Sequence, residues 1–408
     1  MRRMFLPTSR DQALAMDVAD DLAGFREEFS LPDGIVYLDG NSLGPLPTRT
    51  LTRVQEVVAR EWGEDLIRSW TANGWMDLPA TVGRAIAPLI GARPDEVVVA
   101  DSTSVNLFKL LAAVLRMRPG RRTILSEREN FPTDLYMAQG LVDLLGAGAE
   151  LRLVNRSELS GALDEGVAVL ALTHVDFRTG ECHDMAALTA AAHRVGALVL
   201  WDLSHSAGAL PVDLNGCAAD LGVGCGYKFL NGGPGAPAYA FVAGRLQAEL
   251  QSPLWGWLGH AEPFAFSDRY VPAPGIACLL CGTPPILSLT ALACGVEMVG
   301  RAGLERIRRK SLALGGLFIG LVERECGEYG YDLASPRDEA RRGAQVSFRH
   351  PEGGAIMGAL DRAGVVGDFR PPDLLRFGFS PLFLRFVDVW DAVATLRRVS
   401  EERFSRHR

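Results

Sequence analysis

Between residues 95 and 203 the chain alternates short apolar runs with longer segments in which apolar residues recur every three or four positions. The apolar runs predict buried strands at 95–100, 122–126, 149–154, 166–175 and 197–203. Helical spacing occupies 105–117, 135–146 and 183–196. In the last of these helices, Asp184 is placed to cap the start and Gly196 to end it. The repeated order of strand and helix predicts a mostly parallel sheet with helices on both faces.

The pattern changes after Val242. Residues 251–275 are rich in aromatic residues, proline and glycine, which predicts an ordered loop region. Long helices are expected at 288–324, and the remainder mixes strands at 344–350 and 373–380 with helices. We therefore predict an α/β protein with three parts. These are an N-terminal segment (1–50) that packs with the small domain, a large domain (51–290) and a small α+β C-terminal domain (291–408).

Composition and charge exclude several classes of protein. The 408 residues are 48% hydrophobic and 22% charged, and the net charge is −7, so neither a nucleic-acid partner nor an anionic membrane is favoured. The basic cluster 306–310 is expected to be a solvated helix face. No apolar run suggests a signal peptide or reaches the roughly 20 residues of a membrane span.

Cysteine usage points to a reducing compartment. The seven cysteines are odd in number and irregularly spaced, which is not typical of a disulfide framework and favours the cytoplasm. Cys278 and Cys281 form one CxxC pair with no second pair or matching histidines, so no metal is expected there.

Lysine is rare in this chain, which draws attention to Lys228. Of the 42 lysine and arginine residues, only Lys109, Lys228 and Lys310 are lysine, and Lys228 lies in the glycine-rich stretch 222–235. Ligands of open α/β sheets bind at the carboxyl ends of the strands. Thr103 and Ser104 follow the strand at 95–100 and open a helix, where they could hold a phosphate; helix capping by Ser102 or Thr103 explains the same residues equally well.

Two further strand ends carry candidate residues. Phe131 and Asp134 lie in "FPTD", which taken alone is a turn with a capping aspartate. Asp202 ends the strand at 197–203, and an ionised carboxylate is rarely buried without a partner. Asp202 and Lys228 are separated by about one βαβ step.

Together these groups match the needs of pyridoxal phosphate. That cofactor requires an amine for a Schiff base, a carboxylate that keeps its pyridine nitrogen protonated, and anion donors for its phosphate. An arginine stays protonated and cannot replace the amine of Lys228.

At these residues the sequence resembles the kynureninases, pyridoxal-phosphate enzymes of the fold-type I (aspartate aminotransferase-like) superfamily. The resemblance runs from about residue 36 to about residue 382 and rests on "YLDGNSLGPLP", "DSTSVNLFKLL", "FPTD", "WDLSHSAGALPVDL" and "GVGCGYKFLNGGPGAPA". An aspartate, a histidine and a lysine at these spacings also occur in cysteine desulfurases and class V aminotransferases. By contrast, "YKFLNGGPG", "GWLGH" and "TPPIL" are more specific to kynureninases.

The resemblance implies a fold-type I architecture and a role for each residue at the strand ends. Lys228 carries the cofactor, Asp202 pairs with its pyridine nitrogen, and His205 lies beside the ring. Tyr227 hydrogen-bonds the phosphate and is a candidate proton relay. The other implied cofactor contacts are Phe131, stacked on the ring, Asp134 and Thr173 at its polar edge, and Thr103 and Ser104 at the phosphate.

Substrate and subunit contacts are implied in the same way. Trp257 and Thr283 reach the phosphate from a neighbouring subunit, so the resemblance implies a homodimer with shared sites. Arg376 clamps the α-carboxylate of the substrate, a bidentate task suited to its planar fork. Asn41 and Ser42, in "GNSLG", are assigned to the substrate side.

The implied reaction belongs to tryptophan and kynurenine metabolism and, through it, to NAD biosynthesis. Lys228 removes the α-proton of L-kynurenine, and hydrolysis of the Cβ–Cγ bond releases anthranilate and L-alanine. This makes the protein a hydrolase of carbon–carbon bonds in ketonic substances. Some relatives have asparagine where Thr283 stands, near the aryl ring of the substrate. The choice between kynurenine and 3-hydroxykynurenine is therefore left open.

Other enzyme classes share some of these sequence features. "GNSLG" matches the nucleophile elbow of serine hydrolases, but prolines follow it at once where a helix is required. A cysteine desulfurase or a class V aminotransferase-like enzyme is the alternative within the superfamily. A desulfurase needs a nucleophilic cysteine on a mobile loop, whereas Cys326 lies in a segment with the pattern of a helix end.

Overall fold

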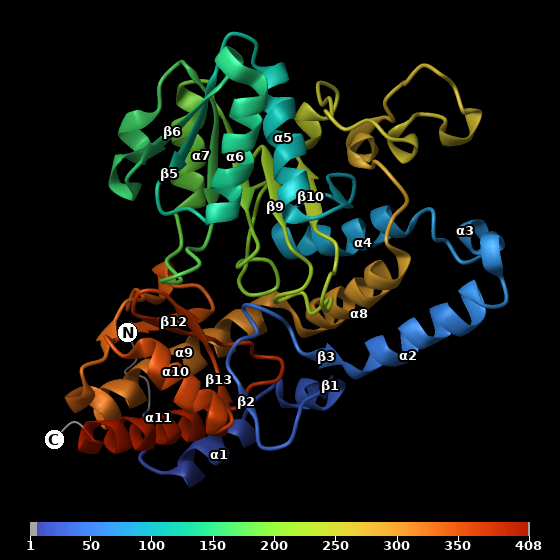
Figure 1. Cartoon of the computed structure of the whole chain (residues 1–408). Helices are drawn as coiled ribbons and strands as arrows, with labels where there is room; N and C mark the ends of the chain where they lie inside the picture. The colour runs from blue at the N-terminus through green and yellow to red at the C-terminus, as the bar shows by residue number, and fades with distance from the viewer. Residues whose placement is uncertain (1–5, 407–408) are drawn as a thin grey trace.

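A seven-stranded sheet forms the centre of the computed structural model, which describes residues 6–406 (Figure 1). The order across the sheet is β4 (Val97–Val99), β10 (Tyr239–Val242), β9 (Leu221–Gly224), β8 (Leu198–Asp202), β7 (Val167–Thr173), β5 (Thr123–Glu127) and β6 (Glu150–Val154). Only β10 runs against its neighbours, so the other six strands are parallel. Their carboxyl ends therefore face the same edge of the sheet.

Alternating side chains bury both faces of this sheet. On β8, Leu198 and Leu200 pack with the helices of one face, and Val199 and Trp201 pack with those of the other. One face is covered by α5 (Thr103–Met117) and α6 (Pro132–Leu145), the other by α4 (Leu78–Ile86), α7 (Met185–Arg194) and α8 (Ile286–Ala302). Burial on both sides explains why the strands appear in the sequence as continuous apolar runs. The predicted parallel sheet with helices on both faces is confirmed.

The predicted capping of α7 is also present. The carboxylate of Asp184 accepts a hydrogen bond from the Ala187 amide at 2.9 Å, and Gly196 adopts the left-handed conformation with φ of 78° just beyond the helix. A residue with a β-carbon is strained there, which is why glycine ends the helix.

The C-terminal part is a smaller α+β unit, as the sequence predicts. Its antiparallel sheet has the order β11 (Asp332–Leu333), β12 (Gln345–Arg349), β15 (Leu374–Gly378) and β14 (Asp368–Arg370). Three helices accompany it: α9 (Leu304–Cys326), α10 (Gly353–Arg362) and α11 (Phe386–Arg406). Figure 1 shows this unit in orange and red below the large sheet.

The N-terminal segment lies against the C-terminal unit. Its elements are α1 (Arg10–Val18), β1 (Phe29–Ser30), β2 (Val36–Tyr37) and β3 (Leu46–Pro47). The side chain of Asp17 accepts the backbone N–H groups of Phe386 and Val387 at 2.6 and 3.1 Å, so it caps the start of α11. In addition, β2 pairs in parallel with β13 (Val365–Val366). The domain boundaries at residues 50 and 290 stay predictions. Residues 1–5 of the N-terminal segment and residues 407–408 of the C-terminal domain lie outside the described residues.

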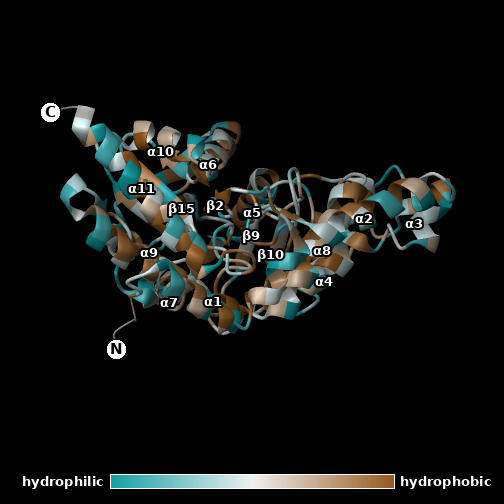
Figure 2. Ribbon diagram, turned by 90° about the horizontal axis from the view of Figure 1, so that it is seen from below, coloured by the Kyte–Doolittle hydropathy of each residue, from teal (hydrophilic) through white to brown (hydrophobic). Residues whose placement is uncertain are grey.

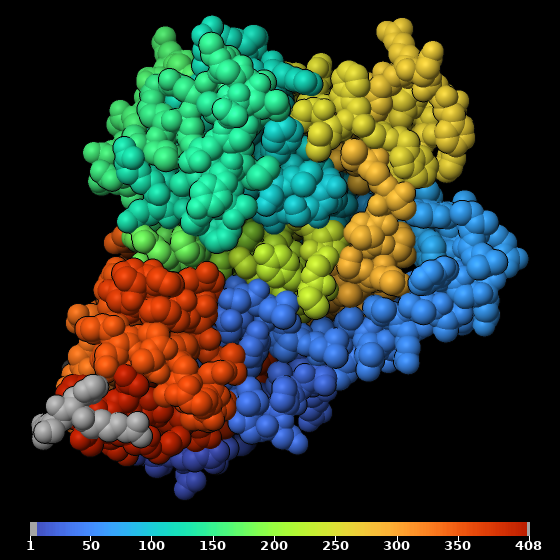
Figure 3. All heavy atoms as spheres, in the orientation of Figure 1, coloured from blue at the N-terminus to red at the C-terminus, as the bar shows by residue number. Residues whose placement is uncertain are grey.

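Two peripheral segments project from the same side of the molecule. The first is the arm of residues 48–72, which begins with α2 (Thr48–Glu56), ends with α3 (Ser69–Ala72) and extends from the body (Figures 1 and 2). The second is the ordered loop 251–275, yellow in Figure 3. Both segments expose large apolar side chains, namely Leu51, Trp62, Leu66, Ile67, Trp255, Phe264 and Phe266. Such surface is typical of a contact with another protein.

The prediction that the basic cluster 306–310 is a solvated helix face is wrong for Ile307 and Lys310, which are buried, and only Arg309 of the five residues is exposed. Lys310 is buried, and its ammonium group lies 2.6 Å from the Asp20 carboxylate and 2.6 Å from the Pro381 carbonyl oxygen. It is buried because its face of α9, shared with Ile307 and Leu314, turns towards the core. Among the described residues no single helix is long and apolar enough to cross a membrane, although α8 and α9, bent by 84° at their junction, pass that test together.

Candidate active site

A cavity of about 220 Å³ lies at the carboxyl ends of the central strands. In Figure 3 the yellow-green residues of this region reach the surface between the upper and lower halves of the molecule. Nine predicted residues line the cavity: Thr103, Ser104, Phe131, Asp134, Thr173, Asp202, His205, Tyr227 and Lys228. Thr133, Phe177 and Ser204 also line it and were not predicted.

Sheet register brings the acidic residues of the cavity together. Thr173 at the end of β7 is the cross-strand partner of Asp202 at the end of β8. The Thr173 hydroxyl donates to the Asp134 carboxyl at 3.1 Å, while the hydroxyl and amide of Ser204 donate to Asp202 at 2.6 and 2.8 Å. Ser204 thus orients Asp202, and its position two residues after a strand-ending aspartate was the available signal for it.

Burial disfavours the charged forms of the two carboxyl groups to different extents. Burial and the neighbouring charge of Asp202 raise the pKa of Asp134 well above its ordinary value. Burial also raises the pKa of Asp202, but the hydrogen bonds from Ser204 and the charge of Lys228 oppose this shift. A hydrogen bond joins the two carboxyl groups. Asp134 is therefore the member of the pair that holds a proton more readily, and Asp202 is the one that ionises more readily.

Lys228 and His205 form a second pair in the cavity. The Lys228 Nζ lies 3.0 Å from the His205 Nε2. Burial, followed by the charge of Lys228, lowers the pKa of His205 well below its ordinary value, so the imidazole is neutral. With Lys228 donating, Nε2 accepts and Nδ1 carries the ring proton of the neutral imidazole. That Nδ1 is buried and has no hydrogen-bond partner among the described residues.

Aromatic rings and a helix start complete the walls. Lys228 Nζ lies 5.9 Å from the ring centres of both Phe131 and Tyr227. At the start of α5, the Ser102 hydroxyl accepts the amide of Val105 at 3.3 Å, so Ser102 is the capping residue. Because Ser102 caps the helix, capping does not explain the presence of Thr103 and Ser104. The first amides of a helix have no acceptor within it, and this helix start can hold an anion.

Arg376 does not line this cavity. It lies on β15 with 1% of its surface exposed, and its guanidinium group donates to the Phe177 carbonyl at 2.6 Å and the Ser42 hydroxyl at 2.8 Å. Its Nη2 also lies 2.5 Å from the carboxylate of Asp368, its cross-strand partner on β14. Asn41 accepts the Arg376 Nε at 3.1 Å when its amide is oriented to suit its neighbours. The predicted substrate residues Asn41, Ser42 and Arg376 thus form one cluster, in which Asn41 and Arg376 are buried and Ser42 is half-buried.

Trp257 and Thr283 are not brought to the cavity by their own chain. Trp257 lies in the loop 251–275 with 37% of its surface exposed. Thr283 lines a separate cavity of about 380 Å³, which Asp101, Ser102 and Tyr227 also line. Their assignment to the site of a neighbouring subunit stays a prediction.

The "GNSLG" bend packs against the backbone of Tyr227 and Lys228, two residues that line the cavity. The Gly44 amide donates to the Tyr227 carbonyl at 2.8 Å, and a side chain at Gly44 would collide with the backbone of Lys228. The next helix, α2, begins only at Thr48, so no nucleophile elbow is formed. Cys326 closes α9 in the core, where burial raises the pKa of its thiol to about 12. Neither rival nucleophile is therefore set up for catalysis.

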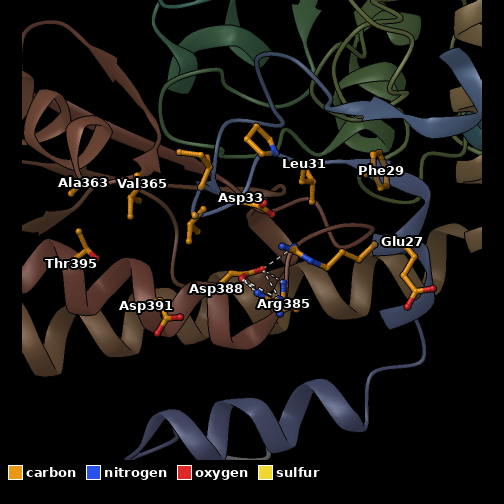
Figure 4. A pocket seen from close by; sticks show the side chains of 16 residues that line it. Glu27, Phe29, Leu31, Asp33, Ala363, Val365, Arg385, Asp388, Asp391 and Thr395 are labelled. Carbon is orange, nitrogen blue, oxygen red and sulfur yellow. Dashed lines mark hydrogen bonds and ion pairs between the residues drawn. The ribbon is translucent and has the colours of Figure 1, made fainter.

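A larger cavity, of about 610 Å³, lies elsewhere, between the N-terminal segment and α11 (Figure 4). Arg26 and Arg385 line it, but both pair with Asp388, at 3.1 and 2.7 Å. The single carboxylate of Asp388 therefore offsets only part of their combined charge. Among residues 6–406 no group of three or more histidine, cysteine or acidic side chains is arranged to hold a metal ion.

Comparison with known proteins agrees with this chemistry. Residues 307–396 match the family model described as the kynureninase C-terminal domain. The kynureninase of Burkholderia mallei is 53% identical over 396 residues, covering 96% of this chain and 95% of that protein. The kynureninase of Pseudomonas fluorescens is 51% identical over 401 residues, covering 97% and 96%.

Solved structures with the same fold are more distant in sequence. A cysteine desulfurase from Thermococcus onnurineus superposes with a TM-score of 0.79 at 19% identity, covering 93% of this chain and 98% of that one. A C-DES mutant described with glycine covalently linked to its pyridoxal-phosphate cofactor has a TM-score of 0.78 at 17% identity, covering 91% and 98%. These likenesses establish the fold-type I architecture.

Proposed function

The chain belongs to the kynureninase family, and on this premise we propose that it hydrolyses L-kynurenine with pyridoxal phosphate bound in the 220 Å³ cavity. The reaction breaks the Cβ–Cγ bond and consumes one water. The hydroxyl group of the water joins the acyl carbon to give anthranilate, and a proton joins the β-carbon to give L-alanine. The observation that carries the proposal is the meeting of Lys228, Asp202 and the start of α5 around one cavity.

The donor set of this cavity fits the cofactor. It offers one amine, one ionised carboxylate, an aromatic ring and a helix start with unsatisfied amides, as well as the unpartnered Nδ1–H of His205. When bound, pyridoxal phosphate supplies an aldehyde for the amino group of the substrate and a ring that withdraws electrons from the α-carbon. Phe131 would cover the ring, and His205 would donate its free N–H to a cofactor oxygen.

Lys228 is the group that moves the substrate proton. Its amine is the base that would take the proton from the α-carbon of the substrate. The neutral His205 imidazole, at 3.0 Å, accepts a hydrogen bond from this amine and keeps it directed into the cavity. Burial around the pair excludes water that would otherwise compete for the same proton.

Asp202 maintains the charge state on which the chemistry depends. Asp202 would hold a proton on the pyridine nitrogen of the cofactor, and Ser204, which donates two hydrogen bonds to it, fixes its orientation. Asp134 retains its own proton and can donate it at the edge of the ring. Thr173, hydrogen-bonded to Asp134, fixes the direction of that donor.

The phosphate would lie at the start of α5. The amides and hydroxyls of Thr103 and Ser104 supply donors there, and the helix dipole favours negative charge. Burial raises the pKa of Tyr227, so its hydroxyl stays protonated as a further donor.

Arg376 would bind the α-carboxylate of the substrate. Its planar fork suits two parallel hydrogen bonds to a carboxylate. In the present arrangement Asp368 occupies one of its donors, so the substrate carboxylate must compete with that side chain. The Phe177 carbonyl, the Ser42 hydroxyl and the Asn41 amide oxygen accept hydrogen bonds from its other donors.

A homodimer would complete each site. The exposed apolar side chains of the arm and of the loop 251–275 supply a surface that needs a partner. Trp257 belongs to that loop, and Thr283 lies beyond its end, so a partner docked on this surface would receive both residues. The phosphate of each subunit would then be held partly by the other.

The experiment that tests the function is a product assay. Purified protein supplied with pyridoxal phosphate is incubated with L-kynurenine or with 3-hydroxy-L-kynurenine, and the aromatic acid and L-alanine are both quantified. We expect equal amounts of anthranilate and L-alanine from L-kynurenine. Release of neither product from either substrate would contradict the proposal, and the ratio of kcat/KM values decides the preferred substrate.

A further inference from the structure

The two lysines outside the cavity have closely similar surroundings. Lys109 and Lys310 are both buried, at 0% and 6% exposure. The Lys310 ammonium contacts one carboxylate and one carbonyl oxygen, as described above. The Lys109 ammonium lies 2.7 Å from the Asp101 carboxylate and 2.7 Å from the Leu279 carbonyl oxygen. Each lysine therefore ties together segments that are distant in the sequence.

The segments that Lys109 joins both border the proposed phosphate site. Asp101 lies in the turn between β4 and α5, immediately before the capping residue Ser102. Leu279 precedes residues 280–283, which line the 380 Å³ cavity opposite Asp101 and Ser102. Lys109 thus fixes the distance between the start of α5 and the segment that leads to Thr283.

The Asp101 turn needs such an anchor. Asp101 has a φ of 49°, the left-handed region that non-glycine residues rarely occupy. Its carbonyl accepts the Ala238 amide at 2.8 Å, which fixes the backbone on one side, and its carboxylate is fixed by Lys109 on the other. Helix side chains lean towards the N-terminus of the helix, so Lys109 can reach back along α5 to this turn.

A lysine suits this position better than an arginine, although arginine is the usual basic residue of the chain. The ammonium group is compact and can direct separate donors to a carboxylate and a carbonyl oxygen. A guanidinium group in the same fully buried space would push the two segments apart.

We propose that Lys109 is a positioning residue for the cofactor phosphate. By joining the Asp101 turn to the segment 279–283, it holds the start of α5 where Thr103 and Ser104 can donate to the phosphate. This inference rests on the proposed function, because it assumes that the phosphate of the cofactor is held at that helix start.

The test compares two ligands that differ only in the phosphate. Apo-protein is titrated with pyridoxal phosphate and with pyridoxal, for wild type, Lys109→Met and the matched control Lys310→Met, which removes an equivalent buried lysine far from the cavity. In Lys109→Met we expect the Kd for pyridoxal phosphate to rise at least about tenfold, as for the loss of a charge-assisted hydrogen bond, and the Kd for pyridoxal to stay unchanged. In Lys310→Met both Kd values should match wild type.

Asp101→Asn provides a second variant if Lys109→Met does not fold. Asparagine tolerates the left-handed backbone and keeps an oxygen for Lys109, but it loses the charge, so a smaller rise in the same Kd is expected. Unchanged affinity for pyridoxal phosphate in the folded variants, or an equal loss for both ligands, would overturn the positioning role. A wild-type protein that binds both ligands equally would instead contradict the proposed phosphate site.

Discussion

Lys228 Nζ and His205 Nε2 lie 3.0 Å apart at the carboxyl edge of the central sheet. This contact joins a residue that follows β8 to one in the glycine-rich turn after β9. Because His205 is neutral, the contact directs the amine without neutralising it. The same cavity places Asp202 close enough to Lys228 for the lysine charge to lower the pKa of Asp202 against the larger effect of burial.

Replacing Lys228 by arginine should abolish turnover of L-kynurenine while the positive charge is kept. A guanidinium group remains protonated and can neither bond to the cofactor aldehyde nor take the α-proton. The measurement is anthranilate release by the purified variant, with circular dichroism as a check of folding. Substantial turnover would remove Lys228 from its role.

Asp202→Asn should leave the fold intact and slow removal of the α-proton by orders of magnitude. An amide cannot hold the pyridine nitrogen protonated, so negative charge on the α-carbon is no longer stabilised. Exchange of the α-hydrogen of L-alanine with deuterated solvent, followed by NMR, measures this step alone. A rate near that of wild type would mean that another acid, such as Asp134, keeps the pyridine nitrogen protonated.

Arg376→Lys should lower kcat/KM for L-kynurenine at least about tenfold, or 1.4 kcal/mol, because the charge stays but the planar fork is lost. The absorbance of the bound cofactor should not change, because Arg376 is proposed to bind the substrate and does not line the cofactor cavity. A variant with unchanged kcat/KM, or one that has lost its cofactor, would show that Arg376 is structural.

Mixing Lys228→Ala with Trp257→Ala should restore part of the activity that each variant lacks alone. Hybrid dimers contain one site with both residues intact if Trp257 serves the neighbouring subunit. Subunit exchange is confirmed first by mass spectrometry of differently tagged chains. Mixtures that stay inactive after exchange, or an active monomer, would rule out the shared site.

Much of this architecture could be predicted because it depends on local patterns. The apolar runs identified five of the seven strands of the sheet, all except β9 and β10, and polar residues at or soon after strand ends, such as Asp202 and Thr103, line the cavity. Parallel strands align their ends, so proximity followed from the fold class alone.

The contacts that escaped prediction depend on register and packing. Asp368 meets Arg376 because β14 and β15 pair at that position, and no local pattern marks it. Lys310 is buried because of what packs on α9, although its neighbours in the sequence are basic. Trp257 and Thr283 act, in the proposed function, across an interface that the packing of one chain does not form.

Reductive labelling tests the central claim most directly, because the chain contains only three lysines. The protein is loaded with pyridoxal phosphate, treated with borohydride for increasing times and digested, and the labelled peptide and the remaining kynurenine cleavage are measured on the same samples. The account predicts one label per chain, on Lys228, and a loss of cleavage in proportion to that label. Label on Lys109 or Lys310 alone, or full cleavage by protein completely labelled at Lys228, would contradict it.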